Sequence, residues 1–205
     1  MKTRLVRSLT PLLLAAIIAA ISGVYAHAAS GTFKTEPDRT MERAHESFLK
    51  GQKDKAAADL HEAGEWVKKQ SDKVGAESRA RMKATGLELD KLGDGVKDGT
   101  VKTGDELKKG FAKVDHSIAT CWHQTAESSK AAGKDSTQAL KESGVALENS
   151  ARWSGHQLSE GTKESVAAVK KAGKAAGEGG KAAAEDVDKW FKGIGEGIKD
   201  LGRKL

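Results

Sequence analysis

The sequence predicts an all-α protein, in which an N-terminal helical hairpin precedes long amphipathic helices built on an eleven-residue repeat. Pro11 and Pro37 are the only prolines, so the last 168 residues contain none. Sheet domains need many turns, and turns commonly use proline. Glycines recur every eleven residues, and uncharged positions follow the same period. Two arrangements stay open: an elongated molecule, or helices folded back as a bundle.

Residues 1–28 are predicted to form a signal peptide. Lys2, Arg4 and Arg7 give a basic start, residues 12–21 are an unbroken apolar run of ten, and Ala26-His27-Ala28 has the small-x-small pattern of a cleavage site. Ten apolar residues are too few for a transmembrane helix, which needs about 20. We therefore expect an exported protein, periplasmic or secreted, whose residues 29–40 are a linker.

The charge balance does not predict a nucleic-acid partner. Without residues 1–28, the chain would carry 32 basic and 29 acidic residues, a net charge of +3 with both signs interspersed. A nucleic-acid-binding protein usually has a basic patch, often with aromatic side chains among the basic ones. Aromatic residues make up only 4% of the chain, which also argues against an enzyme with a walled catalytic pocket.

Residues 41–70 are predicted to form the helical hairpin. Apolar residues recur at spacings of three and four on both sides of Gly51-Gln52, which is a plausible turn. Met41, Ala44 and Phe48 would share one helix face, and Leu60 and Val67 would face them from the second helix. The sequence therefore predicts two helices packed against each other.

Residues 71–180 carry the eleven-residue repeat. Glycines fall at 64, 75 and 86, at 93 and 104, and at 133, 144 and 155. Between residues 92 and 187, four columns of this register contain 35 positions without a charged residue, although the stretch holds 28 charges. Eleven residues in three helical turns give 3.67 residues per turn, so the columns lie on one stripe about 100° wide. We expect a long helix, bent or folded back where glycines cluster at 93–99 and 173–180.

Residues 181–205 are predicted to be a C-terminal amphipathic helix, with apolar residues at helical spacing and lysines beside them. It could lie in a lipid interface or cap a bundle. The stripe and this helix together give the predicted surface or interface residues. They are Leu107, Phe111, Val114, Ile118, Trp122, Leu140, Leu147, Leu158, Val169, Trp190, Phe191, Ile194 and Ile198.

Segments such as VKDGTVKTGDELKKG (96–110) and SGVALENSARWSGHQLSEGTKES (143–165) resemble two groups of helical proteins. One is the late-embryogenesis-abundant proteins, whose eleven-residue repeats form helices on drying or at membranes. The other is the lipid-surface helices of apolipoproteins, perilipins and synucleins. The segment MERAHESFLKGQKDKAAADLHEA is similar to the opening hairpin of the YfdX-type exported helical proteins. The first two likenesses imply stress protection or lipid binding, and the third implies no settled activity.

The candidate chemical residues are few. The part of the chain after residue 28 contains His45, His61, His116, His123 and His156, at spacings that match no metal or haem signature. We therefore predict no metal site, no cofactor and no catalytic residue. Cys121 is the only cysteine, and two alternatives stay open for it: a buried free thiol, or an intermolecular disulfide with a second copy of the chain.

The sequence therefore predicts a non-enzymatic exported helical protein that binds a lipid or envelope surface through the stripe. The alternatives are a self-associating helical bundle with a scaffold or sensor role, and a stress protectant that is disordered in buffer. A homo-oligomer is compatible with the first two hypotheses, and none of the three involves nucleic acid.

Overall fold

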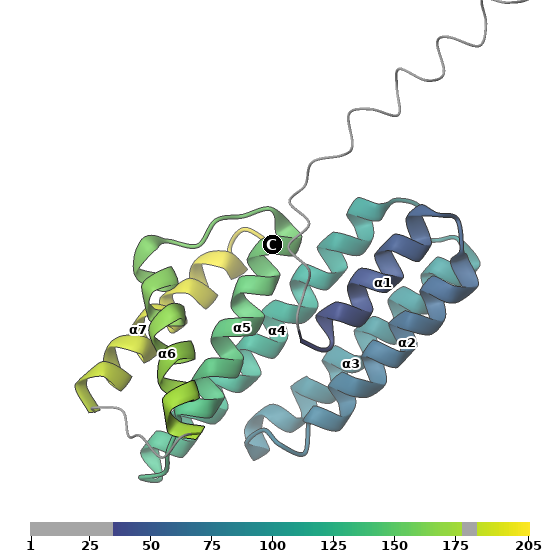
Figure 1. The fold of residues 1–205 in the computed structure, drawn as a ribbon. Coiled ribbons are helices and arrows are strands. Elements are labelled where there is room, and N and C mark those ends of the chain that lie inside the picture. The colour runs from purple at the N-terminus through teal and green to yellow at the C-terminus, as the bar shows by residue number, and fades with distance from the viewer. Residues whose placement is uncertain (1–34, 178–183) are drawn as a thin grey trace, which may run out of the picture. The chain divides into compact units, whose positions relative to one another are not determined.

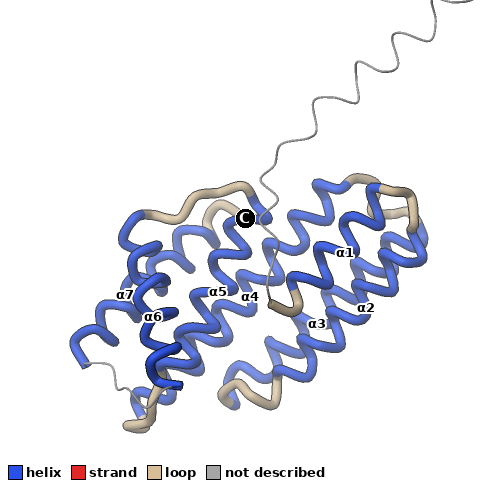
Figure 2. The backbone as a smooth tube through the Cα atoms, viewed as in Figure 1, coloured by secondary structure: helices blue, strands red, loops and turns tan. Residues whose placement is uncertain are grey.

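The computed structural model describes residues 35–177 and 184–205. All regular structure in these residues is helical (Figure 2), so the predicted all-α class is confirmed. The predicted signal peptide and residues 29–34 of the predicted linker lie outside the described residues. The helices are α1 (Asp38–Leu49), α2 (Lys53–Gln70), α3 (Ala76–Asp98), α4 (Gly104–Ala131), α5 (Thr137–Ser154), α6 (Glu160–Gly177) and α7 (Ala184–Gly202).

The helices pack as two groups that share α4 (Figure 1). In the first group, α2 packs between α1 and α3, and both α3 and α1 contact α4. In the second group, α4 packs on α5, and α7 contacts α4, α5 and α6. With 28 residues, α4 is the longest described helix and spans about 42 Å. Its length lets one helix contribute to both groups.

The single long helix expected between residues 92 and 187 is not observed. Helices end instead at Asp98, Ala131 and Ser154, and each is followed within two residues by a glycine with positive φ: Gly99, Gly133 and Gly155. Glycine adopts this left-handed conformation without the steric penalty of a Cβ atom, so it commonly follows the last helical residue. The break expected at 93–99 agrees with the end of α3. The breaks near 133 and 155 were not predicted, and the one expected at 173–180 lies partly outside the described residues.

The repeated glycines therefore have two different structural roles. Gly133 and Gly155 lie in turns, where an added Cβ would meet no atom within 4 Å. Gly144, halfway between them in the sequence, lies inside α5, where a Cβ would be 3.1 Å from Val166 of α6. The same residue type thus ends helices at two positions and lets helices approach closely at the third.

Candidate functional site

Two carboxyl groups are buried next to each other where α1 meets α4. Asp38 begins α1 and is 2% exposed, and Asp115 lies in the middle of α4 and is fully buried. Asp59 is the only other described acidic residue in the buried class, and it lies at the edge of that class at 9%. Charged residues are seldom fully buried unless they are paired. This pair of like groups is therefore the most unusual chemical feature of the described chain.

Asp38 receives hydrogen bonds from two side chains of α5. Asn149 Nδ2 donates to Asp38 Oδ2 at 2.7 Å, and Trp153 Nε1 donates to Asp38 Oδ1 at 3.1 Å. Asn149 and Trp153 are four residues apart, so they lie on the same face of α5. The two oxygens of Asp38 each accept a hydrogen bond from a donor of α5, and these bonds join α1 to α5.

Asp115 has no such donors. Neither of its oxygens has a hydrogen-bond donor among the described residues. Burial raises the pKa of Asp115 well above its ordinary value, and the neighbouring charge of Asp38 raises it further. Burial also raises the pKa of Asp38, against the lowering effect of its hydrogen bonds. A proton on Asp115 would give the pair a donor to Asp38, so the raised pKa values favour a pair that holds one proton.

Aromatic side chains pack around Trp153, the indole donor to Asp38. The Trp153 ring meets Phe111 edge-on at a centroid distance of 4.9 Å and His45 at 6.2 Å. His45 Nε2 is buried and has no hydrogen-bond partner among the described residues. Burial lowers the pKa of His45, and the charge of Lys108 lowers it further. The imidazole is therefore expected to be neutral, and it does not offer the carboxyl pair a compensating positive charge.

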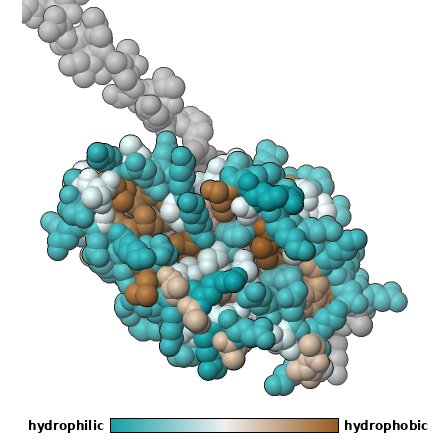
Figure 3. Space-filling view, turned by 180° about the vertical axis from the view of Figure 1, so that it is seen from behind, coloured by the Kyte–Doolittle hydropathy of each residue, from teal (hydrophilic) through white to brown (hydrophobic). Residues whose placement is uncertain are grey.

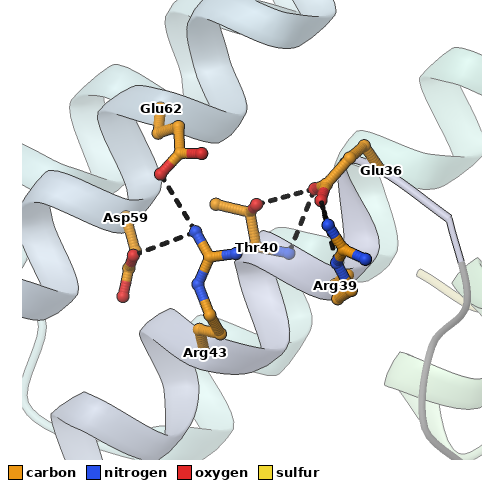
Figure 4. A network of polar contacts seen from close by, with 6 residues as sticks. All are labelled: Glu36, Arg39, Thr40, Arg43, Asp59 and Glu62. Carbon is orange, nitrogen blue, oxygen red and sulfur yellow. Dashed lines mark hydrogen bonds and ion pairs between the residues drawn. The ribbon is translucent and has the colours of Figure 1, made fainter.

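The first turn of α1 is held by residues outside the pair (Figure 4). The Glu36 carboxylate accepts hydrogen bonds from Thr40 Oγ1 at 2.6 Å and from Arg39 Nε at 3.1 Å. Further along α1, Arg43 reaches α2, where its Nη2 lies 3.3 Å from Asp59 Oδ1 and 2.9 Å from Glu62 Oε2. Partly exposed ion pairs of this kind contribute about 0–1 kcal/mol each. The two contacts of Arg43 join α1 to α2, and neither is expected to stabilise the fold strongly.

The structure places the predicted stripe residues inside the fold. Ten of the thirteen are buried and three are half-buried: Trp122, Leu158 and Phe191. Figure 3 shows a face that is mostly hydrophilic, on which hydrophobic side chains form separate patches and not a continuous band. In this fold the uncharged stripe therefore packs helix against helix. The chain folds back and covers most of the stripe.

The predicted C-terminal helix packs onto α4 through two histidines. His116 Nε2 lies 2.8 Å from the backbone oxygen of Ile198, and His123 Nε2 lies 3.2 Å from that of Phe191. A carbonyl oxygen can only accept, so each Nε2 carries the hydrogen. The two histidines are seven residues apart on α4, and the carbonyls they bond are seven residues apart on α7 in the opposite chain direction, so the two helices are antiparallel. The contacts favour the capping role for this helix over the interfacial one.

Glycines of α7 make room for these histidines. A Cβ at Gly202 would lie 2.8 Å from His116 Nε2, and one at Gly195 would lie 3.1 Å from His123 Nε2. Each glycine is four residues after the carbonyl that its histidine reaches. We call these four residues, His116, His123, Gly195 and Gly202, the histidine–glycine clasp.

Cys121 is fully buried between α4 and α3. Its thiol lies 3.8 Å from the Ser78 backbone oxygen, and burial raises its pKa to about 11. Of the two alternatives that the sequence leaves open, this fold contains the buried thiol. A disulfide to a second chain would require α3 and α4 to separate.

The remaining histidines lie apart from one another. His61 of α2 is 3.4 Å from carboxylate oxygens of Asp90 and Asp94 in α3, and His156 is exposed after α5. Within residues 35–177 and 184–205, no three side chains of His, Cys, Asp or Glu are arranged to hold a metal ion. None of the helices described has both the length and the apolar character needed to cross a lipid bilayer.

Sequence reasoning missed the carboxyl pair. It assigned Asp38 to the linker and gave Asp115, Asn149 and Trp153 no role. One signal was present: Asp115 follows Phe111 by four residues and precedes Ile118 by three, so it lies on the apolar face of its helix. A lone carboxylate on such a face indicates a buried, shifted group, but nothing local indicates that its neighbour is Asp38.

Comparisons of the chain with protein-family models, with curated proteins and with solved structures found no match.

Proposed function

We propose that this chain is an exported, non-enzymatic helical bundle with a sensor role, and that the signal it detects is pH. The Asp38–Asp115 pair is the observation that carries the proposal. Both carboxyls are at most 2% exposed, and neither lines the groove between α3 and α4 or the groove between α4 and α7. A buried pair of this kind is accessible to a proton but not to a substrate. The signal-peptide pattern supports a location where external pH reaches the protein.

The proposed switch is the contact between α1 and the helices beneath it. With one proton bound, Asp115 donates to Asp38 and the pair is neutralised to a single negative charge. Without that proton, two adjacent carboxylates would be buried with no hydrogen bond from a cationic side chain. Burying two like charges in this way lowers the free energy of unfolding. The expected response to rising pH is that α1 loosens from α4 and α5. The scaffold of the bundle, including the predicted hairpin and the buried repeat, stays in place.

The direction of the pH effect follows from the raised pKa. A group that binds its proton more tightly when folded contributes its full stability below its unfolded pKa, about 3.9 for Asp, and loses it as pH rises through the folded value. The contribution of the pair to the free energy of unfolding should therefore fall as pH rises from about 3.9 toward the raised folded pKa. The lowered pKa of His45 acts the opposite way below about pH 6.5, because it favours folding as pH rises.

The test compares the purified protein with the Asp115→Asn variant from pH 5 to pH 9. An asparagine can donate to Asp38 at every pH, so the difference in unfolding free energy between the two proteins isolates the proton. We expect the unfolding free energy of the variant to rise relative to that of the wild type as pH rises, by up to about 1.4 kcal/mol per pH unit for one proton. Asp72→Asn, an exposed carboxylate between α2 and α3, is the matched control.

Hydrogen exchange then separates a sensor from a merely pH-sensitive fold. In the wild type, amide protection in α1 should fall with rising pH more than protection in α2, after correction for the intrinsic exchange rate. Equal pH slopes for wild type and Asp115→Asn would refute the proton-binding role. A uniform loss of protection over all helices would refute the sensor role of α1.

The buried stripe favours this bundle over the lipid-surface and stress-protectant hypotheses. Both of those need either an exposed stripe or a chain without structure in buffer. Ten buried stripe residues form part of one continuous core. Surface binding would require that core to open.

A further inference from the structure

A groove of about 510 Å³ lies between α3 and α4, on residues that the carboxyl pair does not involve. Small-molecule sites commonly enclose about 300–1,000 Å³ and combine apolar walls with a few polar groups. Ala84, Leu92 and Val114 provide apolar walls here, and Arg81, Lys109 and Lys113 lie along the rim. The groove thus has the size and composition of a binding site.

The antiparallel packing of α3 on α4 gives the groove two different ends. At one end, Thr85 Oγ1 and Ser117 Oγ share a hydrogen bond of 2.6 Å, and Arg81 lies one turn away on α3. At the other end Leu92 packs over Gly110, where a Cβ would be 2.6 Å from a Leu92 methyl carbon. The ends are seven residues apart on each helix, or about 10 Å. The end with Thr85, Ser117 and Arg81 is therefore the polar end. The other end has Leu92 as its apolar wall, with Glu106 and Lys109 of α4 at its rim.

The charges around the groove are not balanced. Its two acidic residues have other partners as well: Glu88 pairs with Lys91 at 2.9 Å, and Glu106, whose charge also interacts with Lys109, accepts from the backbone N–H groups of Lys102 and Thr103 at 2.6 and 3.1 Å. By contrast, none of the three rim cations forms an ion pair with a described residue. The groove therefore presents positive charge beside apolar walls.

We propose that the α3–α4 groove binds a single-chain anionic amphiphile of the fatty-acid class. Its carboxylate lies between Arg81 and Lys113 at the polar end, and its alkyl chain extends toward Leu92 along Val114. A length of about 10 Å selects a medium-length chain over a long one. Arg81 can hold a carboxylate with two parallel hydrogen bonds, whereas Lys113 acts as a point charge. This proposal does not depend on the pH response of the carboxyl pair.

The test is calorimetric titration of the purified protein with decanoate below its critical micelle concentration. We expect one decanoate per chain. The double variant Arg81→Gln/Lys113→Gln should weaken binding at least tenfold, because it removes both cations of the polar end. The matched control, Arg79→Gln/Lys83→Gln, makes the same charge change at exposed positions of α3 outside the groove and should bind as the wild type does.

Three further titrations show whether decanoate binds through its charge, through its alkyl chain, or in place of a lipid bilayer. Decyl glucoside, which has no charge, and decyltrimethylammonium, which has the opposite charge, should bind much more weakly than decanoate. Vesicles with anionic lipid test the bilayer as the source of the same chemistry. The proposal fails if decanoate does not bind, if decyl glucoside binds equally well, if both double variants bind alike, or if only vesicles bind.

A second variant tests the groove by filling it, without changing any charge. Ala84→Phe places a ring on the exposed wall of the groove and should abolish decanoate binding while the helical circular dichroism spectrum stays unchanged. Retained binding in this variant would place the amphiphile elsewhere and overturn the proposal.

Discussion

Trp153 donates its indole N–H to Asp38 at 3.1 Å, although 115 residues separate the two in the chain. Asp38 opens the first described helix and Trp153 lies near the end of α5, so this contact joins the outer helix of the first group to the second group. The bond is buried at Asp38, where water cannot replace a missing donor. Its loss should therefore have a cost that an exposed hydrogen bond would not have.

The Trp153→Phe variant tests this contact. It keeps an aromatic ring against Phe111 but removes the donor to Asp38, and should lower the free energy of unfolding by about 1–3 kcal/mol. The measurement is urea unfolding followed by circular dichroism. Trp66→Phe, at a half-buried tryptophan of α2, is the control for replacing an indole with a phenyl ring. Equal effects of the two variants would show that the hydrogen bond does not matter.

The close approach of α2 and α3 predicts a strong effect at Gly86. A Cβ there would lie 2.7 Å from the Gly64 backbone oxygen, which cannot move without the helix. We expect Gly86→Ala to destabilise the protein by about 1–3 kcal/mol through overpacking. Gly161→Ala is the opposite case, because a Cβ in that part of α6 meets nothing within 4 Å. That variant should stabilise by about 0.5–1 kcal/mol, and thermal unfolding would compare the two.

The buried thiol predicts slow labelling of Cys121. With its pKa raised to about 11 and its side chain fully buried, the thiol should react with a maleimide only when α3 and α4 open. The measurement is the labelling rate by mass spectrometry in buffer and in urea, with a small free thiol as the reference. Labelling in buffer at the rate of the reference thiol would contradict this burial.

The histidine–glycine clasp predicts that α7 can be loosened without unfolding the rest. Removing one imidazole donor, as in His116→Ala or His123→Ala, should cost about 1 kcal/mol and speed amide exchange in α7 more than in α2. His156→Ala changes an exposed histidine and should leave exchange in α7 as it was. If the His116 and His156 variants exchange alike, the clasp does not hold this helix.

Helical periodicity was enough to predict the fold class and to select stripe residues of which most are buried. Phe111, Val114 and Ile118 repeat at spacings of three and four, and any packed helix would bury such a face. The same periodicity could not show whether the covering surface is a lipid, a second chain or another part of the same chain. That choice depends on where the helices turn.

The turns were missed because a regular repeat hides them. Gly133, Gly144 and Gly155 are equally spaced, yet only the first and last have positive φ. A turn of five residues fits into an eleven-residue register without shifting it, so an unbroken register does not require an unbroken helix. Long-range partners such as Asp38 and Asn149, or His116 and Ile198, carry no local signal at all.

Because both groups share α4, a fragment of the described chain can contain all of the first group, but no fragment without α4 can contain all of the second. A fragment from α1 to α4 contains every helix of the first group, whereas a fragment from α5 to α7 lacks the helix on which α5 and α7 pack. Two folding units cannot be separated by a cut in any loop, because each would need its own copy of α4. A truncation after α4 could therefore keep every helix of the first group, whereas the second group could be inherited only together with α4, in the middle of the chain.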